Sequence, residues 1–364
     1  MNPFVACLSA FGITAALLWI LRPLAIRIGL VDHPGDRKRH VGSIALVGGV
    51  AMFCGLMFSV VMTDVALGGF RAFFTSAALL IIVGILDDFH ELPSWARFAA
   101  QIVAALLMSL WGGVVVTDLG ALTGGASVQL GIWAVPFTVF ATIGVINAIN
   151  MIDGVDGLAG GISLVALLLL SWVAQSGGRD ADGVVLLVLG CTVAAFLLFN
   201  ARFPGRRHAL VFMGDAGSML LGFSLAWFAI TLSQGTERAM TPVSALWILA
   251  LPLVDTVAIM IRRSTSGRLL FTAARDHFHH LLLDVGHSVN RTVSVMLGMA
   301  AVAGIAGVIG LHAGLSESLM FAGFLAIGLA HLWNLGRLTR IAAHEARRKR
   351  VVKAALKVSS GTRL

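Results

Sequence analysis

Charged residues are scarce in this chain. Only 12% of its 364 residues are charged, whereas 58% are hydrophobic. Soluble domains carry about 25% charged residues, so this composition excludes an ordinary soluble fold. Apolar runs close to the ~20 residues needed to cross a bilayer recur along the whole length. The sequence therefore predicts an all-α polytopic membrane protein, and it contains no internal repeat or low-complexity tract.

Cysteine is also scarce. The three cysteines, Cys7, Cys54 and Cys191, all lie within apolar runs, and no Cys-x-x-Cys spacing occurs. The sequence thus predicts no disulfide and no cysteine metal site.

Four common catalytic and nucleotide-binding motifs are missing as well: Gly-x-x-x-x-Gly-Lys-[Ser/Thr], Gly-x-Gly-x-x-Gly, His-Glu-x-x-His and Gly-x-Ser-x-Gly. ATPase, Rossmann, zincin and serine-hydrolase functions therefore lose their usual support.

The apolar runs predict about eleven transmembrane helices. Their approximate bounds are 3–27, 44–63, 70–86, 96–114, 131–149, 159–176, 183–200, 209–232, 243–261, 293–312 and 317–335. We expect a single integral-membrane domain over residues 1–335 and a basic cytoplasmic tail over residues 336–364. The first segment has no basic region before it, so we expect a retained helix and not a cleaved signal.

Basic residues indicate the orientation of these helices. With the N-terminus outside, all but three of the 26 lysines and arginines fall on the cytoplasmic side, the exceptions being Arg71, Arg179 and Arg238. This asymmetry is a strong positive-inside signal. An odd number of helices also places the basic tail inside. Anionic lipid accounts for the net charge of +8, and nucleic acid is not an expected partner.

Five polar motifs fall on the cytoplasmic side of this topology. They are Asp87-Asp88, the run 150–157, Gly214-Asp215, Asp255, and His277-Phe278-His279-His280. Carboxylates near membrane depth are costly and usually functional. Their shared side predicts one active site formed by cytoplasmic helix ends and loops.

Two of these motifs suit a divalent cation. Asp87 and Asp88 repel each other beside the membrane core, and Mg²⁺, which takes carboxylate oxygens, would remove that cost. Alternatively, one of the two acts as a base, or the pair is solvated at a helix end. The small neighbours of Asp215 expose its carboxylate to a metal or phosphate, although a simple helix N-cap is the alternative.

A run of amides and carboxylates forms the third motif. Asn147, Asn150, Asp153 and Asp156 repeat every three residues, so on a helix they would share one face. Two carboxylates and two amides can hold a metal-diphosphate or bind a nucleobase or sugar. A glycine-rich turn with helix caps is the alternative, because a glycine follows each aspartate.

Histidines gather in the longest cytoplasmic loop, 262–292. They are adjacent to arginines, which favours an anionic phosphate as the ligand over a zinc cluster. A partly solvated interfacial helix is the alternative. Asp255 lies two turns from Arg262, so structural pairing is as consistent with its position as catalysis.

The order of these motifs resembles that of the polyprenyl-phosphate N-acetylhexosamine-1-phosphate transferases. The resemblance covers roughly residues 31–292. The matching motifs are Asp87-Asp88, Asn150-x-x-Asp153-Gly154-x-Asp156-Gly157, Phe212-Met213-Gly214-Asp215-x-Gly217-Ser218 and His277-x-His279-His280. The His-x-His-His form and the segment Arg37-Lys38-Arg39-His40 resemble the undecaprenyl-phosphate GlcNAc-1-phosphate branch. Ala45 departs from the family pattern, in which a proline is usual there.

This resemblance implies a reaction. GlcNAc-1-phosphate would pass from UDP-GlcNAc to undecaprenyl phosphate, giving GlcNAc-diphospho-undecaprenol and UMP, the first lipid-linked step of a cell-envelope polysaccharide such as O-antigen. Mg²⁺ is the implied cofactor, with Mn²⁺ as a substitute. The implied partners are UDP-GlcNAc, undecaprenyl phosphate and the lipid bilayer, and a homodimer is left open. The implied location is the bacterial inner (plasma) membrane, with the C-terminus and active site cytoplasmic.

Other functions are weighed beside this one. The same reaction with another UDP-N-acetylhexosamine is one alternative. An ion-coupled secondary transporter is another, but it predicts charges near mid-membrane and internal repeats. An intramembrane aspartyl protease needs only two aspartates and leaves the histidine loop unexplained.

The resemblance also assigns roles to residues. The expected catalytic residues are Asp87, Asp88, Asp153, Asp156, Asp215 and His279. The expected metal ligands are Asp88, Asp215 and Asp87. The expected substrate-binding residues are Asn147, Asn150, Lys38, His40, Arg275, His277 and His280. Asp87 would deprotonate or orient the lipid phosphate. Single displacement and a covalent aspartyl intermediate both stay open.

Overall fold

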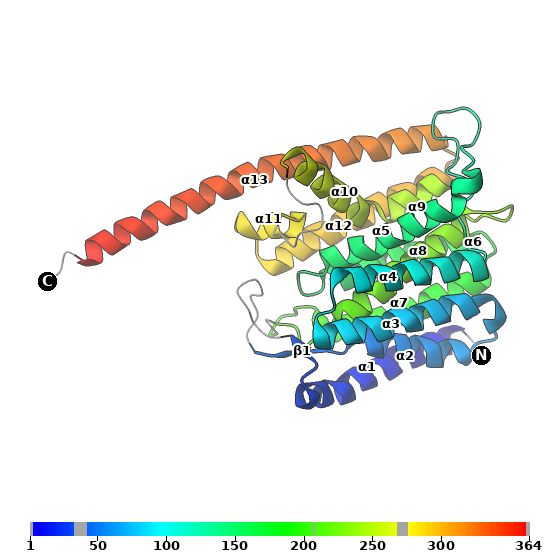
Figure 1. The fold of residues 1–364 in the computed structure, drawn as a ribbon, viewed down its shortest axis with the longest axis horizontal. Helices are drawn as coiled ribbons and strands as arrows, with labels where there is room; N and C mark the ends of the chain where they lie inside the picture. Colours follow the sequence, from blue (N-terminus) through cyan, green and yellow to red (C-terminus); the bar gives the residue numbers. More distant parts are fainter. Residues whose placement is uncertain (1–2, 33–41, 207, 268–275, 362–364) are drawn as a thin grey trace.

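The computed structural model describes residues 3–32, 42–206, 208–267 and 276–361, and it is built almost wholly of helices (Figure 1). The α-helices are α1 (Pro3–Ile28), α2 (Gly48–Val61), α3 (Arg71–His90), α4 (Ser94–Leu106), α5 (Ala134–Ile152), α6 (Leu158–Ser176), α7 (Asp180–Asn200), α8 (Gly214–Ser233), α9 (Pro242–Ile248), α10 (Ala250–Thr265), α11 (Phe278–Asp284), α12 (Val289–His312) and α13 (Glu317–Gly361). Three short helical turns adjoin them, η1 (Leu67–Phe70), η2 (Leu107–Trp111) and η3 (Gly131–Trp133). Most of the long helices lie side by side in one bundle (Figure 1).

The helices confirm an all-α polytopic membrane protein. Within the described residues, 9 helices are long and apolar enough to cross a bilayer, and α9 with α10 makes a tenth as a span bent by 83°. Pro252, near the start of α10, has no N–H to donate to the preceding turn, which favours the break. Helix α2 has 14 residues, or about 21 Å, less than the ~30 Å hydrocarbon core. Each of the eleven predicted segments contains helix. Helix α2, however, is shorter than a full span.

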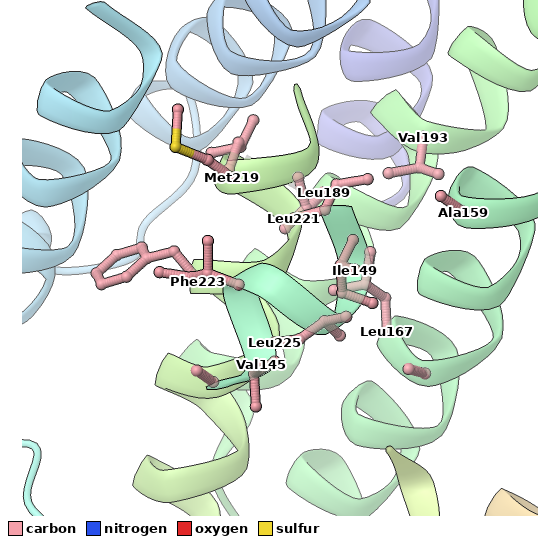
Figure 2. Packing of buried hydrophobic residues seen from close by; sticks show 14 of the residues in the cluster. Val145, Ile149, Ala159, Leu167, Leu189, Val193, Met219, Leu221, Phe223 and Leu225 are labelled. Carbon is pink, nitrogen blue, oxygen red and sulfur yellow. The ribbon is translucent and has the colours of Figure 1, made fainter. Parts of the chain in front are cut away.

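Helix α8 forms the centre of the bundle. It is buried along nearly its whole length, as expected for a helix that is apolar all round. Figure 2 shows Leu221 and Leu225 of α8 lying near Ile149 of α5, while Phe223 points away from them. The ring of Phe223 stacks on Phe73 of α3, with centroids 5.9 Å apart. A polar motif at the first turn of α8 is thus held by a rigid core.

Small residues let the neighbouring helices approach α8 closely. A Cβ atom on Gly84 of α3 would overlap the backbone of Ala216 in α8. One on Gly49 of α2 would overlap the backbone of Gly217. Backbones can come this near only where no side chain intervenes. These contacts bring the ends of α2 and α3 against the first turn of α8.

A small sheet, which the all-α prediction does not contain, lies at the same end of the bundle. Strands β1 (Val31–Asp32), β2 (Ile44–Leu46) and β3 (Val211–Phe212) pair in that order. Ala45 pairs with Val31 in the antiparallel sense and with Val211 in the parallel sense. Strands of two or three residues are too short to produce a detectable alternation of polar and apolar residues. Because β2 leads into α2 and β3 into α8, the sheet joins the two entry points.

The two ends of the bundle differ. The start of α1 and the end of α13 lie at opposite ends of the molecule (Figure 1). Two of the arginines predicted outside lie together away from the sheet, where Arg179 pairs with Asp182 at 2.9 Å and Arg238 pairs with Glu317 at 3.4 Å. Helix α13 continues without a break for 45 residues. The predicted tail therefore extends the last spanning helix, and no change of secondary structure marks residue 335.

Candidate active site

Asp88 and Asp215 meet at the junction of α3 and α8. The backbone N–H of Asp215 donates to Oδ1 of Asp88 at 2.9 Å. Gly214 makes this contact possible, because its φ of +70° favours glycine and a Cβ there would overlap the Asp88 carboxylate. Oδ2 of Asp88 is buried and has no hydrogen-bond partner among the described residues. One carboxylate oxygen is thus fixed by backbone while the other remains available.

Arg97 joins Asp87 to Asp215. Asp87 lies in the last turn of α3 and is buried. Nη1 of Arg97, near the start of α4, is 3.2 Å from Oδ2 of Asp87 and 3.6 Å from Oδ2 of Asp215. A single guanidinium therefore offsets the repulsion between two carboxylates that face each other. From its sequence position alone, Arg97 indicates only membrane topology, although it is the first arginine or lysine after the Asp-Asp pair.

Asn150 completes this group from α5. Its side-chain N–H groups donate to Oδ1 of Asp215 and, at 2.8 Å, to Oγ of Ser218. Four helices, α3, α4, α5 and α8, thus contribute polar side chains to one place. The structure brings Asp87, Asp88, Asn150 and Asp215 together.

Asp153 and Asp156 lie in a turn and not on a helix, which corrects the shared-face prediction. Helix α5 ends at Ile152, and Asp153 caps it with φ −74° and ψ 53°. Burial, then the nearby charges of Asp215 and Asp156, raises the pKa of Asp153 to about 7. Gly154 and Gly157 lie in this turn and disfavour a continued helix, although a three-residue spacing is compatible with one.

The carboxylate of Asp156 accepts hydrogen bonds from the segment between α7 and β3. Nε of Arg202 donates to its Oδ2 at 2.7 Å, and the backbone N–H of Ala209 donates at 3.2 Å. From its sequence position alone, Arg202 also indicates only membrane topology. These bonds tie the turn to the segment that leads into β3. These contacts support a positioning role for Asp156. The pKa of Asp153, in contrast, is raised in part by the charge of Asp215.

The histidine loop reaches the same turn from α11. His279 is fully buried, and a Cβ on Gly154 would lie 2.6 Å from its Nε2. The rings of His279 and His280 have centroids 4.1 Å apart. The ring of His277 instead bonds to Asp255 of α10, from Nδ1 to Oδ2 at 3.0 Å. Asp255 is thus paired with histidine, and Arg262 bonds to Thr339.

The remaining predicted residues divide into two sets. The amide of Asn147 donates to Gln101 of α4 at 2.7 Å and to the backbone oxygen of Ile143 at 2.9 Å, so one bond joins α5 to α4 and the other stays within α5. Lys38, His40 and Arg275 lie outside the described residues.

The residues present fit a divalent cation bound together with phosphate. Among the described residues, no group of three or more His, Cys, Asp and Glu side chains is arranged to hold a metal ion. Mg²⁺, however, is usually held by one or two carboxylates and completes its shell with water and substrate phosphate. The buried, unpartnered Oδ2 of Asp88, next to Asp215, is a suitable oxygen ligand.

Two cavities lie elsewhere. One measures about 380 Å³ and is lined by residues that include Leu311 and Glu317. The other measures about 660 Å³ and is lined by residues that include Trp227 and Gln234. Of the predicted site residues that the structure describes, none lines either cavity. Both are therefore distinct from the polar cluster.

Comparisons with known proteins agree with the motifs. Residues 70–233, which run from α3 through α8, match the family described as Glycosyl transferase family 4. An undecaprenyl-phosphate alpha-N-acetylglucosaminyl 1-phosphate transferase of Yersinia pestis is 36% identical over 348 residues, covering 95% of each chain. The protein of the same name from Haemophilus influenzae is 36% identical over 354 residues, covering 96% of this chain and 99% of the relative.

A more distant relative of the same name, from Escherichia coli K12, is 33% identical over 294 residues, covering 81% of this chain and 80% of the relative. The Yersinia pestis and Haemophilus influenzae relatives align with 95% and 96% of this chain, so the likeness includes both the helices that carry the aspartates and the loop that carries the histidines. The chain therefore belongs to glycosyl transferase family 4 and is a membrane-embedded glycosyl-1-phosphate transferase.

Proposed function

We propose that this protein transfers GlcNAc-1-phosphate from UDP-GlcNAc to undecaprenyl phosphate and releases UMP. The observation that carries the proposal is the convergence of Asp87, Asp88 and Asp215 around Arg97, in a chain whose relatives are named for this transfer. O-antigen or a similar cell-envelope glycan is the proposed destination of the product.

The chemistry requires two phosphate groups of like charge to meet. Cationic groups must offset that charge in the transition state. We assign Asp88 and Asp215 as ligands of Mg²⁺ or Mn²⁺, with Asp87 beside them. When bound, the ion would neutralise the diphosphate and stabilise the UMP leaving group. The Arg97 guanidinium, which lies between Asp87 and Asp215, is placed to hold both carboxylates in orientation.

Asp87 is assigned to the acceptor. It lies in the last turn of α3 and is buried beside Arg97, and its carboxylate would take or orient a proton of the lipid phosphate. Holding acceptor and donor side by side converts a bimolecular step into a local one. The membrane fold suits this task because the lipid acceptor is confined to the bilayer.

The donor is assigned to the turn after α5 and to the histidine loop. Asn150 donates to Asp215, the charge of Asp215 contributes to the raised pKa of Asp153, and His279 lies against Gly154. Ring N–H groups of His277, His279 and His280 can donate to phosphate oxygens as charge builds. Lys38, His40 and Arg275 remain proposed contacts to the nucleotide sugar.

The proposed location is the bacterial inner membrane, with the N-terminus outside. The cluster then faces the cytoplasm, where nucleotide sugars are made. A transporter would place its carboxylates near mid-membrane, whereas these lie at helix ends. Another UDP-N-acetylhexosamine is the alternative donor.

Purified protein tests the proposal directly. It is incubated with UDP-GlcNAc, Mg²⁺ and undecaprenyl phosphate, and released UMP is measured. We expect UMP release that requires the lipid, with one GlcNAc-diphospho-lipid formed per UMP. Release without lipid would contradict the transfer reaction. Faster release from UDP-GalNAc than from UDP-GlcNAc would contradict the sugar assignment alone.

A further inference from the structure

A buried carboxylate with two histidine partners lies behind the histidine loop. Asp255 of α10 is fully buried. Its Oδ2 is 3.0 Å from Nδ1 of His277, and its Oδ1 is 3.0 Å from Nε2 of His331 in α13. The backbone N–H of Phe278 also donates to Oδ1 at 3.3 Å. A buried carboxylate is costly unless hydrogen bonds satisfy both oxygens, and here they do.

This group connects α13 to the transfer site. His277 caps α11, so the bonds to Asp255 hold both its ring and the first backbone N–H of that helix. The ring of His277 stacks on His279, with centroids 5.9 Å apart and planes 16° apart. His279 in turn lies against Gly154. The ring of Phe278 also packs on His331 at 4.9 Å.

We propose that Asp255 and His331 are positioning residues that orient His277 and hold His279 against the Gly154 turn. The inference rests on the proposed transfer reaction. A carboxylate that accepts from Nδ1 of an imidazole fixes both the orientation of the ring and the nitrogen that carries its proton. His331 contributes by bonding the second oxygen of Asp255 from a helix that supplies no other candidate site residue.

Substitution of His331 separates positioning from packing. His331→Leu removes the donor to Asp255. His331→Gln places an amide N–H near the position of Nε2, whereas the shorter His331→Asn does not reach it. Thr339→Val is the matched control, because Arg262 donates to Thr339 at 2.8 Å and this bond also joins α10 to α13, two helical turns away.

Two measurements are made on the full-length protein in the same detergent or nanodiscs. Lipid-dependent UMP release yields kcat and KM, and hydrogen exchange is followed for the backbone amides of residues 277–284. We expect His331→Leu to lower kcat by about 10- to 100-fold, the usual effect of removing a group that orients a functional histidine. KM for UDP-GlcNAc should change by less than about threefold. Exchange in residues 277–284 should accelerate, His331→Gln should recover most of both losses, and Thr339→Val should behave as wild type.

Three outcomes would overturn the inference. One is a kcat for His331→Leu within twofold of wild type. Another is equal loss in the Gln, Asn and Leu variants, which would indicate general packing. The third is equal acceleration of exchange in Thr339→Val. If wild-type protein releases no UMP, the proposed function fails, but the exchange comparison still decides whether His331 orders α11.

Discussion

The backbone N–H of Asp215 donates a 2.9 Å hydrogen bond to Oδ1 of Asp88, and this bond joins the last turn of α3 to the first turn of α8. The N-terminus of a helix carries partial positive charge, so the carboxylate is also favoured electrostatically there. Its other oxygen is buried without a hydrogen-bond partner among the described residues. The orientation of Asp88 is therefore set by main chain, and its second oxygen is left for a ligand.

Asp88→Asn separates these two properties. The amide oxygen of asparagine can still accept from Asp215, so the junction should hold, but the negative charge is lost. We expect kcat to fall by about 10²–10³-fold, the scale for losing one electrostatic contact to the transition state. Asp180→Asn, an exposed change at the first turn of α7, is the control and should retain wild-type activity. Near-normal turnover of Asp88→Asn would contradict the metal assignment.

Removal of divalent cations should abolish turnover. Asp87, Asp88 and Asp215 lie together with one guanidinium between two of them, which leaves an excess of negative charge for a substrate that is itself anionic. Excess EDTA should stop UMP release, and added Mg²⁺ or Mn²⁺ should restore it, since both take oxygen ligands. Full activity in chelator would show that basic side chains of the protein offset the phosphate charge without a metal ion.

The pair Asp156–Arg202 should act as a unit. Arg202 donates to Asp156 at 2.7 Å, so loss of either partner displaces the same turn. We expect Asp156→Asn and Arg202→Gln to lower kcat to a similar extent, with the double variant little worse than either single one. Residues in one ion pair commonly show coupling of ~0.5–3 kcal/mol. An inactive Asp156→Asn beside a fully active Arg202→Gln would indicate direct catalysis by Asp156.

Stability should depend on pH through Asp153. Burial, followed by repulsion from Asp215 and Asp156, raises its folded-state pKa to about 7, above the ~3.9 of an unfolded chain. Between these values the folded protein binds a proton that the unfolded chain has lost, so stability falls as pH rises from ~4 to ~7. The Tm advantage of Asp153→Asn over wild type, measured in EDTA, should grow from pH 5 to pH 7. A constant difference across that window would contradict the raised pKa.

Accessibility tests the orientation. In a background without native cysteines, a cysteine at Ser266 should react with an impermeant maleimide only from the cytoplasmic side. A cysteine at Thr236 should react only from the other side, because it lies near Arg238, one of the arginines predicted outside. Labelling of position 266 from outside would contradict the predicted topology. The site would then face a compartment that lacks nucleotide sugars.

Local patterns determined much of this protein from sequence alone. The length of apolar runs decides whether a helix can span a bilayer, and the distribution of lysine and arginine predicts which end faces the cytoplasm. Both are read along the chain without knowledge of its neighbours. The motifs around Asp88, Asp153, Asp215 and His279 were sufficient for the family as well, because their order and spacing are properties of the sequence.

Only the tertiary structure decided which polar groups meet. Arg97 had the appearance of an ordinary topological arginine until its helix placed it between Asp87 and Asp215. His331 is 76 residues from Asp255, in the last of the predicted spans. A three-residue spacing is compatible with either a helix or a turn, so Asp153 was misplaced. These relations depend on close backbone contacts between helices, such as that at Gly84, and a one-dimensional pattern does not specify which helices touch.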